Sequence, residues 1–193
     1  RRLIKHTQKY MKIEEIGYDN SWYNPGAGVV KRLLWYFVNI WFIKCNWLPL
    51  RQPRIWLLRL FGAKVGKMVF IKPGVNIKNP WYLEIDDYAW IGENVWIDNL
   101  VKVHIGKKAC VSQNAYLMCG NHNYKKATFD LMVGEIDIQE GAWVGANCTV
   151  CPGVTMKPYS ILSVGSVASK DLDAYGIYRG NPAVKVRERF IEK

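Results

Sequence analysis

Between Val65 and Ala168 the chain repeats with a period of six residues, which fits neither an α-helix nor a plain strand. An aliphatic residue stands at each repeat, and a small or β-branched residue stands two positions before most of them. The aliphatic positions are Val65, Ile71, Ile77, Leu83, Ile85, Ile91, Ile97, Val103, Ile105, Val111, Leu117, Ile138, Val144, Val150, Met156 and Leu162. The small positions are Val69, Val75, Ala89, Val95, Ala109, Ala115, Ala142, Cys148, Val154, Ser160 and Ser166.

This pattern predicts a mainly β fold, a parallel β-helix in which three six-residue repeats close one triangular coil. Each aliphatic side chain points inward and stacks on its counterpart in the next coil, and each such burial contributes about 1.5–3 kcal/mol. Glycine follows the aliphatic residue at Gly66, Gly92, Gly106 and Gly145, where a side chain would crowd the turn. A β-sandwich with accidental spacing is the alternative, and the two-position register over so many repeats disfavours it.

The chain has 193 residues, which suits one solenoid domain with flanking segments. We expect an N-terminal extension and helical cap over residues 1–60, the solenoid over residues 61–170, and a strand or helix tail over residues 171–193. The net charge of +11 predicts an acidic partner: an anionic membrane, a phosphorylated cofactor or substrate, or nucleic acid. Because the basic residues form no recognisable nucleic-acid-binding module, nucleic acid is not an expected partner.

The five cysteines lack the spacing of a disulfide framework. Cys148 and Cys151 form a C-x-x-C motif, but Cys148 occupies a small inward position of the repeat. This position favours core packing over redox or metal chemistry. The cysteine usage therefore predicts a reducing, cytoplasmic location.

Residues 29–60 combine aromatic and aliphatic residues with flanking basic residues. The run from Leu33 to Ile43 predicts a helix, and Lys44 interrupts it well before the ~20 residues of a membrane span. Pro49 and Pro53 are expected to break the chain before a second short helix that begins at Ile55. Such a segment can cap the open end of a solenoid and can also lie on an anionic membrane, and the two uses can coexist. The basic residues expected to contact lipid are Arg32, Lys44, Arg51 and Arg54.

The six-residue repeat breaks between Leu117 and Ile138. A long excursion from a regular scaffold is usually functional, so we expect a catalytic loop over residues 118–137. This loop contains His122, one of three histidines in the chain. We expect His104 to be a solvated residue at a coil corner, while His6 lies in the unpatterned N-terminus.

Several segments resemble hexapeptide-repeat acyltransferases, the left-handed β-helix enzymes that use acetyl-CoA, and most resemble the exopolysaccharide O-acetyltransferases of colanic acid biosynthesis. The resemblance extends over nearly the whole chain from Tyr18 onward. The segments that carry it are Tyr18-Asp19-Asn20-Ser21, Leu60-Phe61-Gly62-Ala63, Asn79-Pro80-Trp81, Ile91-Gly92-Glu93-Asn94-Val95-Trp96-Ile97, Gly120-Asn121-His122, Gly141-Ala142-Trp143-Val144-Gly145-Ala146, Pro152-Gly153-Val154 and Gly180-Asn181-Pro182-Ala183. We therefore expect a left-handed parallel β-helix with an N-terminal helical segment and a short C-terminal helix.

The resemblance also implies roles for individual residues. His122 matches the general base that takes a proton from an acceptor hydroxyl, a task that suits imidazole because its ordinary pKa is about 6.5. Asp98 and Asn99 fall near the wall that binds the acceptor. The residues that match contacts to acetyl-CoA are Trp143, Ala146, Val164, Ser169 and Arg187.

The leading functional prediction is an acetyl-CoA-dependent O-acetyltransferase that modifies a sugar hydroxyl of an exopolysaccharide or capsule intermediate. The resemblance further implies a homotrimer with sites between subunits. The acceptor is expected to be a sugar or lipid-linked sugar, met at the inner face of the cytoplasmic membrane. No metal is expected. One alternative is a noncatalytic solenoid scaffold, and another is a carbonic-anhydrase-like metalloenzyme that would pair His104 with His122 across subunits.

Overall fold

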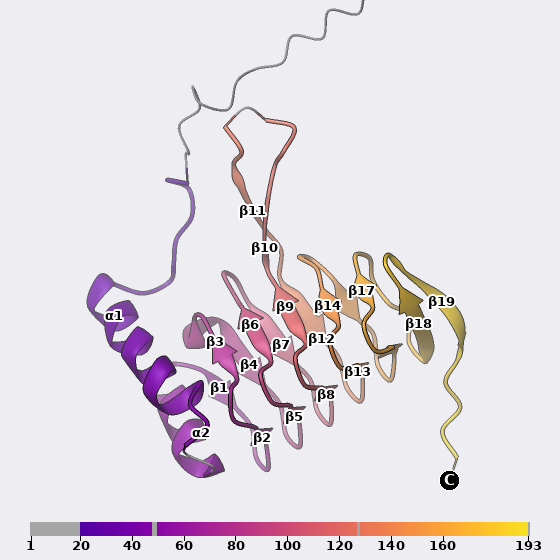
Figure 1. Cartoon of the computed structure of the whole chain (residues 1–193), viewed down its shortest axis with the longest axis horizontal. Helices are drawn as coiled ribbons and strands as arrows, with labels where there is room; N and C mark the ends of the chain where they lie inside the picture. Colours follow the sequence, from indigo (N-terminus) through magenta and orange to yellow (C-terminus); the bar gives the residue numbers. More distant parts are fainter. Residues whose placement is uncertain (1–19, 48–49, 127, 193) are drawn as a thin grey trace, which may run out of the picture.

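The computed structural model describes residues 20–47, 50–126 and 128–192 of the chain. The predicted extension over residues 1–19 lies outside these residues, as does Lys193. Three parallel sheets form the walls of a solenoid, and their strands follow one another along its length (Figure 1). The prediction of a mainly β, parallel β-helical fold is therefore confirmed.

The strands of each wall recur in chain order. Sheet A contains β1 (Lys64–Val65), β4 (Leu83–Ile85), β7 (Val103–Ile105), β12 (Ile136–Ile138) and β15 (Thr155–Met156). Sheet B contains β2 (Phe70–Ile71), β5 (Trp90–Ile91), β8 (Cys110–Val111), β13 (Trp143–Val144), β16 (Ile161–Leu162), β18 (Gly176–Gly180) and β19 (Ala183–Glu188). Sheet C contains β3 (Asn76–Ile77), β6 (Trp96–Asp98), β9 (Tyr116–Met118), β14 (Thr149–Val150) and β17 (Val167–Ala168).

The predicted inward register is confirmed by strand pairing and burial. In sheet C, Ile97 pairs with Ile77 on one side and with Leu117 on the other, and all three are fully buried. Every predicted aliphatic position is buried except Val65, which is half-buried in the first coil. All the small positions are buried as well, because the residues two before the aliphatic ones face the same narrow interior.

The six-residue count restarts where Leu83 is followed by Ile85 and where Val103 is followed by Ile105. These restarts reflect coils of unequal length. Val65 pairs with Ile85, twenty positions later, whereas Ile138 pairs with Met156, only eighteen positions later. The longer coils have a wider corner between sheets C and A, which in the first coil includes the 3₁₀ turn η3 (Pro80–Tyr82). The extra residues at this corner shift the phase of the six-residue count, which explains why the count begins again there.

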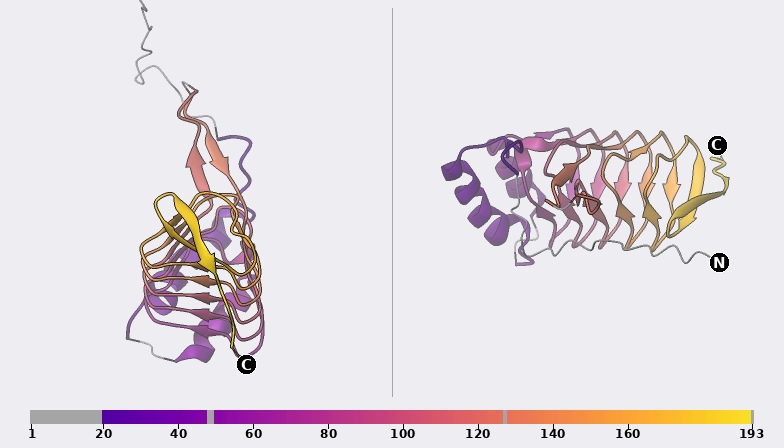
Figure 2. Two further views of the ribbon diagram at one scale, coloured as in Figure 1. Left: turned by 90° about the vertical axis from the view of Figure 1, so that its right-hand side faces the viewer. Right: turned by 90° about the horizontal axis from the view of Figure 1, so that it is seen from above.

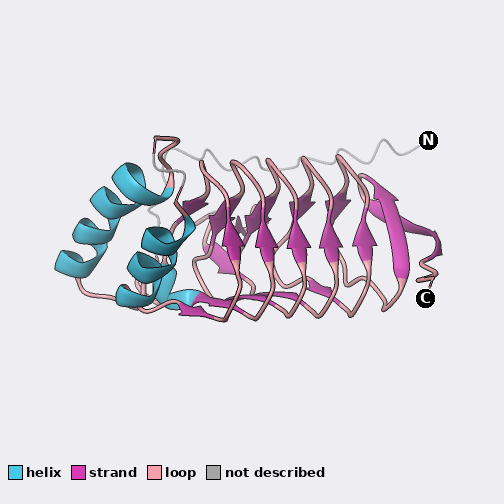
Figure 3. Cartoon of the chain, turned by 90° about the horizontal axis from the view of Figure 1, so that it is seen from below, coloured by secondary structure: helices cyan, strands magenta, loops and turns pink. Residues whose placement is uncertain are grey.

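Two helices and a π-helical turn close one end of the solenoid, as Figures 2 and 3 show. These elements are α1 (Val29–Val38), η2 (Asn39–Ile43) and α2 (Arg51–Leu60). Trp35 is buried, and its Nε1–H donates to the Ile77 carbonyl of the first coil at 2.9 Å. None of the described helices combines the length and the hydrophobicity that a membrane span requires.

The prediction that Pro53 breaks the chain before α2 was wrong. The helix begins at Arg51, so Pro53 lies in its first turn. The first helical N–H groups have no partner within a helix, and a proline there loses no hydrogen bond.

The predicted short C-terminal helix was also wrong. β18 joins sheet B beside β16, and β19 folds back antiparallel on β18. Val184 and Val186 alternate with Lys185 and Arg187, which is the period of a strand rather than of a helix. The described residues after Glu188 continue without regular structure to residue 192.

Candidate active site

The excursion from the repeat is a two-stranded hairpin that projects from one corner of the solenoid (Figure 1). β10 (Gly120–His122) pairs antiparallel with β11 (Leu131–Val133), and His122 stands opposite Leu131. The two ends of the excursion meet, because the Gly134 N–H donates to the Cys119 carbonyl at 2.9 Å. The expected loop over residues 118–137 is thus mainly a hairpin, with residue 127 outside the described residues.

Residues 20–28, here called the N-terminal strap, contact the paired strands of this hairpin and the coil beside it. The Asn20 side-chain oxygen accepts a hydrogen bond from the Leu131 N–H at 3.3 Å. The Tyr23 hydroxyl donates to the Leu100 carbonyl at 2.9 Å, and burial raises the pKa of Tyr23 to about 12. The strap therefore links the chain before α1 to the strand next to His122.

His122 is positioned by a backbone carbonyl and an aromatic ring of the same hairpin. Its Nδ1 lies 3.0 Å from the Phe129 carbonyl oxygen, and its ring stacks on the Phe129 ring with centroids 4.5 Å apart. A carbonyl only accepts hydrogen bonds, so this contact requires the proton on Nδ1 of the neutral ring and leaves the lone pair on Nε2. The Phe129 carbonyl, within hydrogen-bond reach of Nδ1, therefore orients the imidazole ring.

A cavity of about 450 Å³ lies on the outer face of sheet B, near the C-terminal end of the solenoid. Its lining includes Trp143, Ala146, Val164 and Arg187, four of the five residues predicted to contact acetyl-CoA. The Trp143 indole N–H donates to the Ser112 hydroxyl at 2.8 Å, which fixes the ring at the cavity wall. The sequence resemblance therefore selected residues that the fold brings together from β13, β19 and the turns between coils.

Gly145 lines this cavity, whereas Ser169 does not. Gly145 lies in its wall, where an added Cβ would stand 2.7 Å from the Leu162 carbonyl oxygen, so only glycine allows this close approach of coils. Ser169, the fifth predicted contact, is exposed in the turn after β17 of sheet C and does not line the cavity. Its contact with acetyl-CoA stays a prediction.

Asp98 and Asn99 follow one another on sheet C but differ in their surroundings. Asp98 forms an ion pair with Lys78 at 2.8 Å and lies 3.3 Å from the Tyr116 hydroxyl. Asn99 is fully buried, and its amide group bonds to the backbone of Asn79 at 3.0 and 2.5 Å. The amide group of Asn99 thus braces the wide corner, and the acceptor contacts of Asp98 and Asn99 stay predictions.

His104 is a strand residue of sheet A, so the expectation of a solvated corner residue was wrong. Its Nδ1 lies 2.6 Å from Asp137 Oδ1, and its Nε2 lies 3.0 Å from Asp86 Oδ2. Burial alone would lower the pKa of His104, but the hydrogen bonds to Asp137 and Asp86 outweigh burial and raise it. The signal in the sequence is that His104 stands between Val103 and Ile105, which both point inward.

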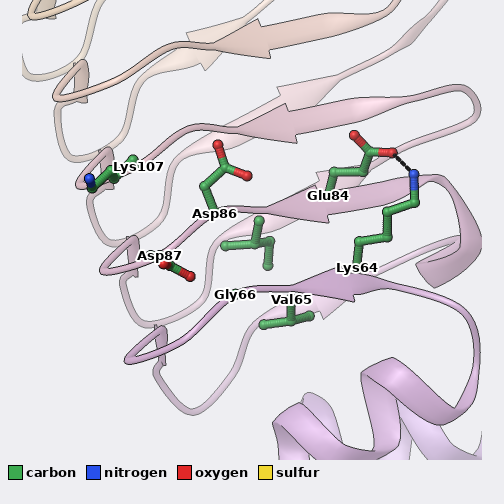
Figure 4. A pocket seen from close by; sticks show the side chains of 8 residues that line it. Lys64, Val65, Gly66, Glu84, Asp86, Asp87 and Lys107 are labelled. Carbon is green, nitrogen blue, oxygen red and sulfur yellow. Dashed lines mark hydrogen bonds and ion pairs between the residues drawn. The ribbon is translucent and has the colours of Figure 1, made fainter.

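The outer face of sheet A is a ladder of opposite charges around a second cavity of about 440 Å³. Glu84 accepts from Lys64 at 2.6 Å and from Lys102 at 2.8 Å, and these hydrogen bonds lower its pKa to about 2. Figure 4 shows Glu84 and Lys64 reaching toward each other, with Asp86 further along the same strand direction. These charges pair between neighbouring coils, which is a structural use of the wall.

The hairpin and the sheet B cavity lie on opposite sides of the solenoid. The hairpin leaves the chain between β9 of sheet C and β12 of sheet A, at the corner that faces away from sheet B. None of the described hairpin residues lines the cavity. A catalytic site that uses both His122 and this cavity therefore needs a second copy of the chain.

The cysteines and the other possible metal ligands are structural in the part of the chain that is described. Burial raises the pKa of the Cys148 and Cys151 thiols, which fits core packing rather than thiolate chemistry. Among residues 20–47, 50–126 and 128–192, no group of three or more His, Cys, Asp or Glu side chains could hold a metal ion. Both ring nitrogens of His104 are hydrogen-bonded to carboxylates, so neither is available as a metal ligand. His104 therefore gives no support to the metalloenzyme alternative.

Comparison with known proteins gives the same fold and a related family. The chain is 38% identical over 164 residues to the putative colanic acid biosynthesis acetyltransferase WcaF of Escherichia coli K12, which covers 85% of this chain and 90% of the relative. A hexapeptide-repeat acetyltransferase of Vibrio cholerae, solved in complex with acetyl coenzyme A, superposes with a TM-score of 0.75 at 19% identity over 84% of this chain and 88% of the other. A maltose O-acetyltransferase of Clostridium difficile superposes with a TM-score of 0.76 at 18% identity, over 84% of this chain and 88% of the other.

No family model matches the chain. The alignment with the E. coli relative nevertheless extends over most of both chains. The chain therefore belongs to the family of the colanic acid biosynthesis acetyltransferase WcaF, and it is an acetyltransferase of the hexapeptide-repeat type.

Proposed function

We propose that this protein is an acetyl-CoA-dependent O-acetyltransferase that modifies a sugar hydroxyl of an exopolysaccharide or capsule intermediate, with His122 as general base. The observation that carries the proposal is the single cavity shared by Trp143, Ala146, Val164 and Arg187. A noncatalytic scaffold has no need for such a cavity. The E. coli relative is a putative colanic acid biosynthesis acetyltransferase, which supports a polysaccharide intermediate as the acceptor.

The cavity has the chemistry that a thioester of pantetheine and a nucleotide requires. Trp143 and Val164 supply apolar surface for the pantetheine arm, and Ser112 and Ser163 supply polar groups for its amides. The Arg187 guanidinium stands in the same lining, where a cation favours phosphate oxygens. The V. cholerae acetyltransferase of the same fold has been solved with acetyl coenzyme A, which is consistent with this use of the cavity.

His122 would act on the acceptor rather than on the thioester. The Phe129 carbonyl holds the proton on Nδ1, so the Nε2 lone pair can take the proton of a sugar hydroxyl. The hydroxyl oxygen then bonds to the acetyl carbonyl carbon, the carbon–sulfur bond breaks, and the thiolate takes a proton and leaves as coenzyme A. Asp98 ends β6 beside Met118 of β9, just before the hairpin begins, and forms an ion pair with Lys78; it is the proposed contact for other hydroxyls of the sugar.

The outer faces of the three sheets support a homotrimer. Sheet A presents charged and polar residues outward, whereas sheets B and C present aromatic residues. Trp90 stacks on Phe70 of sheet B with ring centroids 5.0 Å apart, and Trp96 stacks on Tyr116 of sheet C at 4.8 Å. Exposed aromatic surface of this kind favours contact between copies. If sheet B of one subunit meets the sheet C side of the next, a hairpin reaches the neighbouring cavity.

Mixed trimers test both the catalytic assignment and the shared site. His122→Ala removes the base, and Val164→Trp fills the cavity at a position where the side chain is 68% exposed and folding should be unaffected. Each variant alone should be inactive with acetyl-CoA and an acceptor. After co-expression, random trimers should recover about a quarter of wild-type turnover, because each mixed trimer has one site with an intact hairpin and an intact neighbouring cavity. No recovery from trimers shown to be mixed would overturn the shared site.

The acceptor itself is identified by release of free thiol from acetyl-CoA in the presence of nucleotide-linked and lipid-linked sugars. We expect release with a lipid-linked sugar of the exopolysaccharide type, and not with acetyl-CoA alone. Such an acceptor would keep the enzyme in the cytoplasm, in peripheral contact with the inner face of the membrane. Equal release with and without every sugar would contradict the proposed reaction.

A further inference from the structure

Nearly all the net positive charge of the chain lies at the helical end. Residues 20–83 contain ten Lys and Arg residues and no Asp or Glu, whereas residues 84–193 contain twelve basic and thirteen acidic residues. The basic stretch comprises the strap, α1, η2, α2 and the first coil, which occupy one end of the solenoid (Figure 3). A single end of the molecule is therefore suited to an anionic partner.

The outward side of α1 and η2 is apolar. A helix that packs on a soluble protein normally presents polar residues to water on its outer side. Here helical spacing places a set of exposed apolar residues opposite Trp35, which is buried against the first coil. Their exposed fractions range from 41% to 72%, and they are Val29, Val30, Leu33, Leu34, Tyr36, Phe37, Ile40 and Trp41. The apolar surface continues over Trp47, Leu50, Trp56 and Leu60, which are each 59–63% exposed.

Basic side chains flank this apolar surface. Arg32, Lys44 and Lys78 line a cavity of about 370 Å³ between α1 and sheet C, together with Tyr36 and Trp96. Lys78 forms an ion pair with Asp98 at 2.8 Å. Arg32 and Lys44 belong to residues 20–83, which contain no acidic residue. Cations beside aromatic rings suit the headgroup region of a bilayer, where phosphate and acyl chain meet.

One predicted lipid contact is corrected by the structure. Arg54 is fully buried, and its Nη2 donates to the Cys45 carbonyl at 3.1 Å, so it holds α2 against the preceding turn. Arg51 is half-buried with its guanidinium 4.6 Å from the centre of the Phe70 ring. The residues left to meet lipid directly are Arg32 and Lys44.

We propose that the helical end is a docking surface for an anionic phospholipid bilayer, with the apolar side of α1 and η2 in the interface and Arg32 and Lys44 at the headgroups. A second copy of the chain fits this surface less well, because two equally basic ends repel each other. The inference deepens the proposed function and rests on it for the lipid-linked acceptor and the trimer. Threefold symmetry would turn three helical ends toward the same side, so that weak contacts add.

Vesicle flotation tests the docking surface without acetyl-CoA or acceptor. Wild-type protein should float with vesicles of phosphatidylcholine and phosphatidylglycerol at low salt, and should not float with phosphatidylcholine alone. Arg32→Gln with Lys44→Gln should weaken binding about 30-fold, in line with the contribution of two cations near a charged surface. Phe37→Ser with Trp41→Ser should weaken it at least about ten-fold, because two exposed aromatic rings no longer enter the interface.

The matched control is Phe190→Ser with Lys170→Gln, which removes one exposed aromatic ring and one exposed cation at the opposite end of the solenoid. This control should float like the wild type. Equal flotation with neutral and anionic vesicles, or none with either, would overturn the proposal. So would a lower molecular mass of the Phe37→Ser, Trp41→Ser variant in sedimentation, because the surface would then join copies of the chain. Thiol release with a soluble acceptor is measured separately, so loss of docking and loss of catalysis are distinguishable.

Discussion

The stacked coils and the hairpin β10–β11 each hold one histidine, and they hold it in different ways. His104 lies in the middle of a wall, between carboxylates of the coils on either side. His122 lies outside the stack, against a carbonyl and a ring of its own hairpin. A ring clamped by two acids is suited to carry a charge and to join coils. A ring beside a carbonyl is suited to keep its Nδ1 proton and to offer a lone pair, as a general base must.

The largest expected effect comes from a charge inside the stack. Ile97→Asp would place a carboxylate between Ile77 and Leu117, where every neighbour is apolar. Burying an unpaired charge costs several kcal/mol or more, so little folded protein should be recovered. Glu93→Ala is the control, because Glu93 is exposed and its distance to Lys72 is 3.6 Å. Thermal unfolding measures both, and equal melting temperatures would refute the assigned register.

The next largest effect is confined to the hairpin. His122→Ala should lower turnover about 10²–10⁴-fold, the usual contribution of general-base catalysis. The free energy of unfolding and the oligomeric state should not change, because the ring stacks on Phe129 of its own hairpin, outside the aliphatic core of the coils. Steady-state kinetics with the true acceptor and sedimentation of the same sample give both answers. Wild-type turnover in this variant would contradict the role of His122 and would favour the noncatalytic scaffold alternative.

The smallest effect separates the wall histidine from the hairpin histidine. The carboxylates raise the pKa of His104, so its charged form stabilises the fold below the ordinary histidine pKa of about 6.5 and this stabilisation is lost as pH rises through the raised value. His104→Gln, which stays neutral, should therefore melt a few degrees lower than the wild type at acid pH, and the difference should shrink at alkaline pH. Melting temperatures across this range measure it.

Turnover is the second measurement for the wall histidine. His104→Gln should keep wild-type turnover at neutral pH, because its ring contacts Asp86 and Asp137 and does not line the sheet B cavity. A pH-independent melting difference would contradict the charged clamp. A large loss of turnover would contradict the division of roles between the two regions.

Much of the wall was predictable from sequence, because one aliphatic residue in every six enforces the same burial in every coil. The rest of the wall was harder to predict, because the six-residue count restarts at the wide corners. The burial of Asn99 was not predicted, because the wide corner that shifts the count also buries its amide against Asn79. His104 looked like a corner residue for the same reason. The partners of His104 come from coils that are 18 and 33 positions away, and no local pattern relates such distant residues.

The residues of the candidate site were predicted in a different way. The resemblance to known acyltransferases selected Trp143, Ala146, Val164 and Arg187, and coil stacking brings them to one cavity. The carbonyl that orients His122 could not be predicted, since it depends on how the hairpin closes around Phe129. The strand β19 could have been predicted, because Val184 and Val186 alternate with basic residues in the sequence.

The meeting of the hairpin ends has a consequence for how such enzymes diversify. The Gly134 N–H donates a hydrogen bond to the Cys119 carbonyl, so the chain leaves and re-enters the coil at nearly the same point. β12 then pairs with β7 in the same register as the other strands of sheet A. The hairpin is therefore an insertion that the stack tolerates without changing its register. The length and the side chains of the hairpin can therefore change while the walls, with the proposed donor cavity, keep their register.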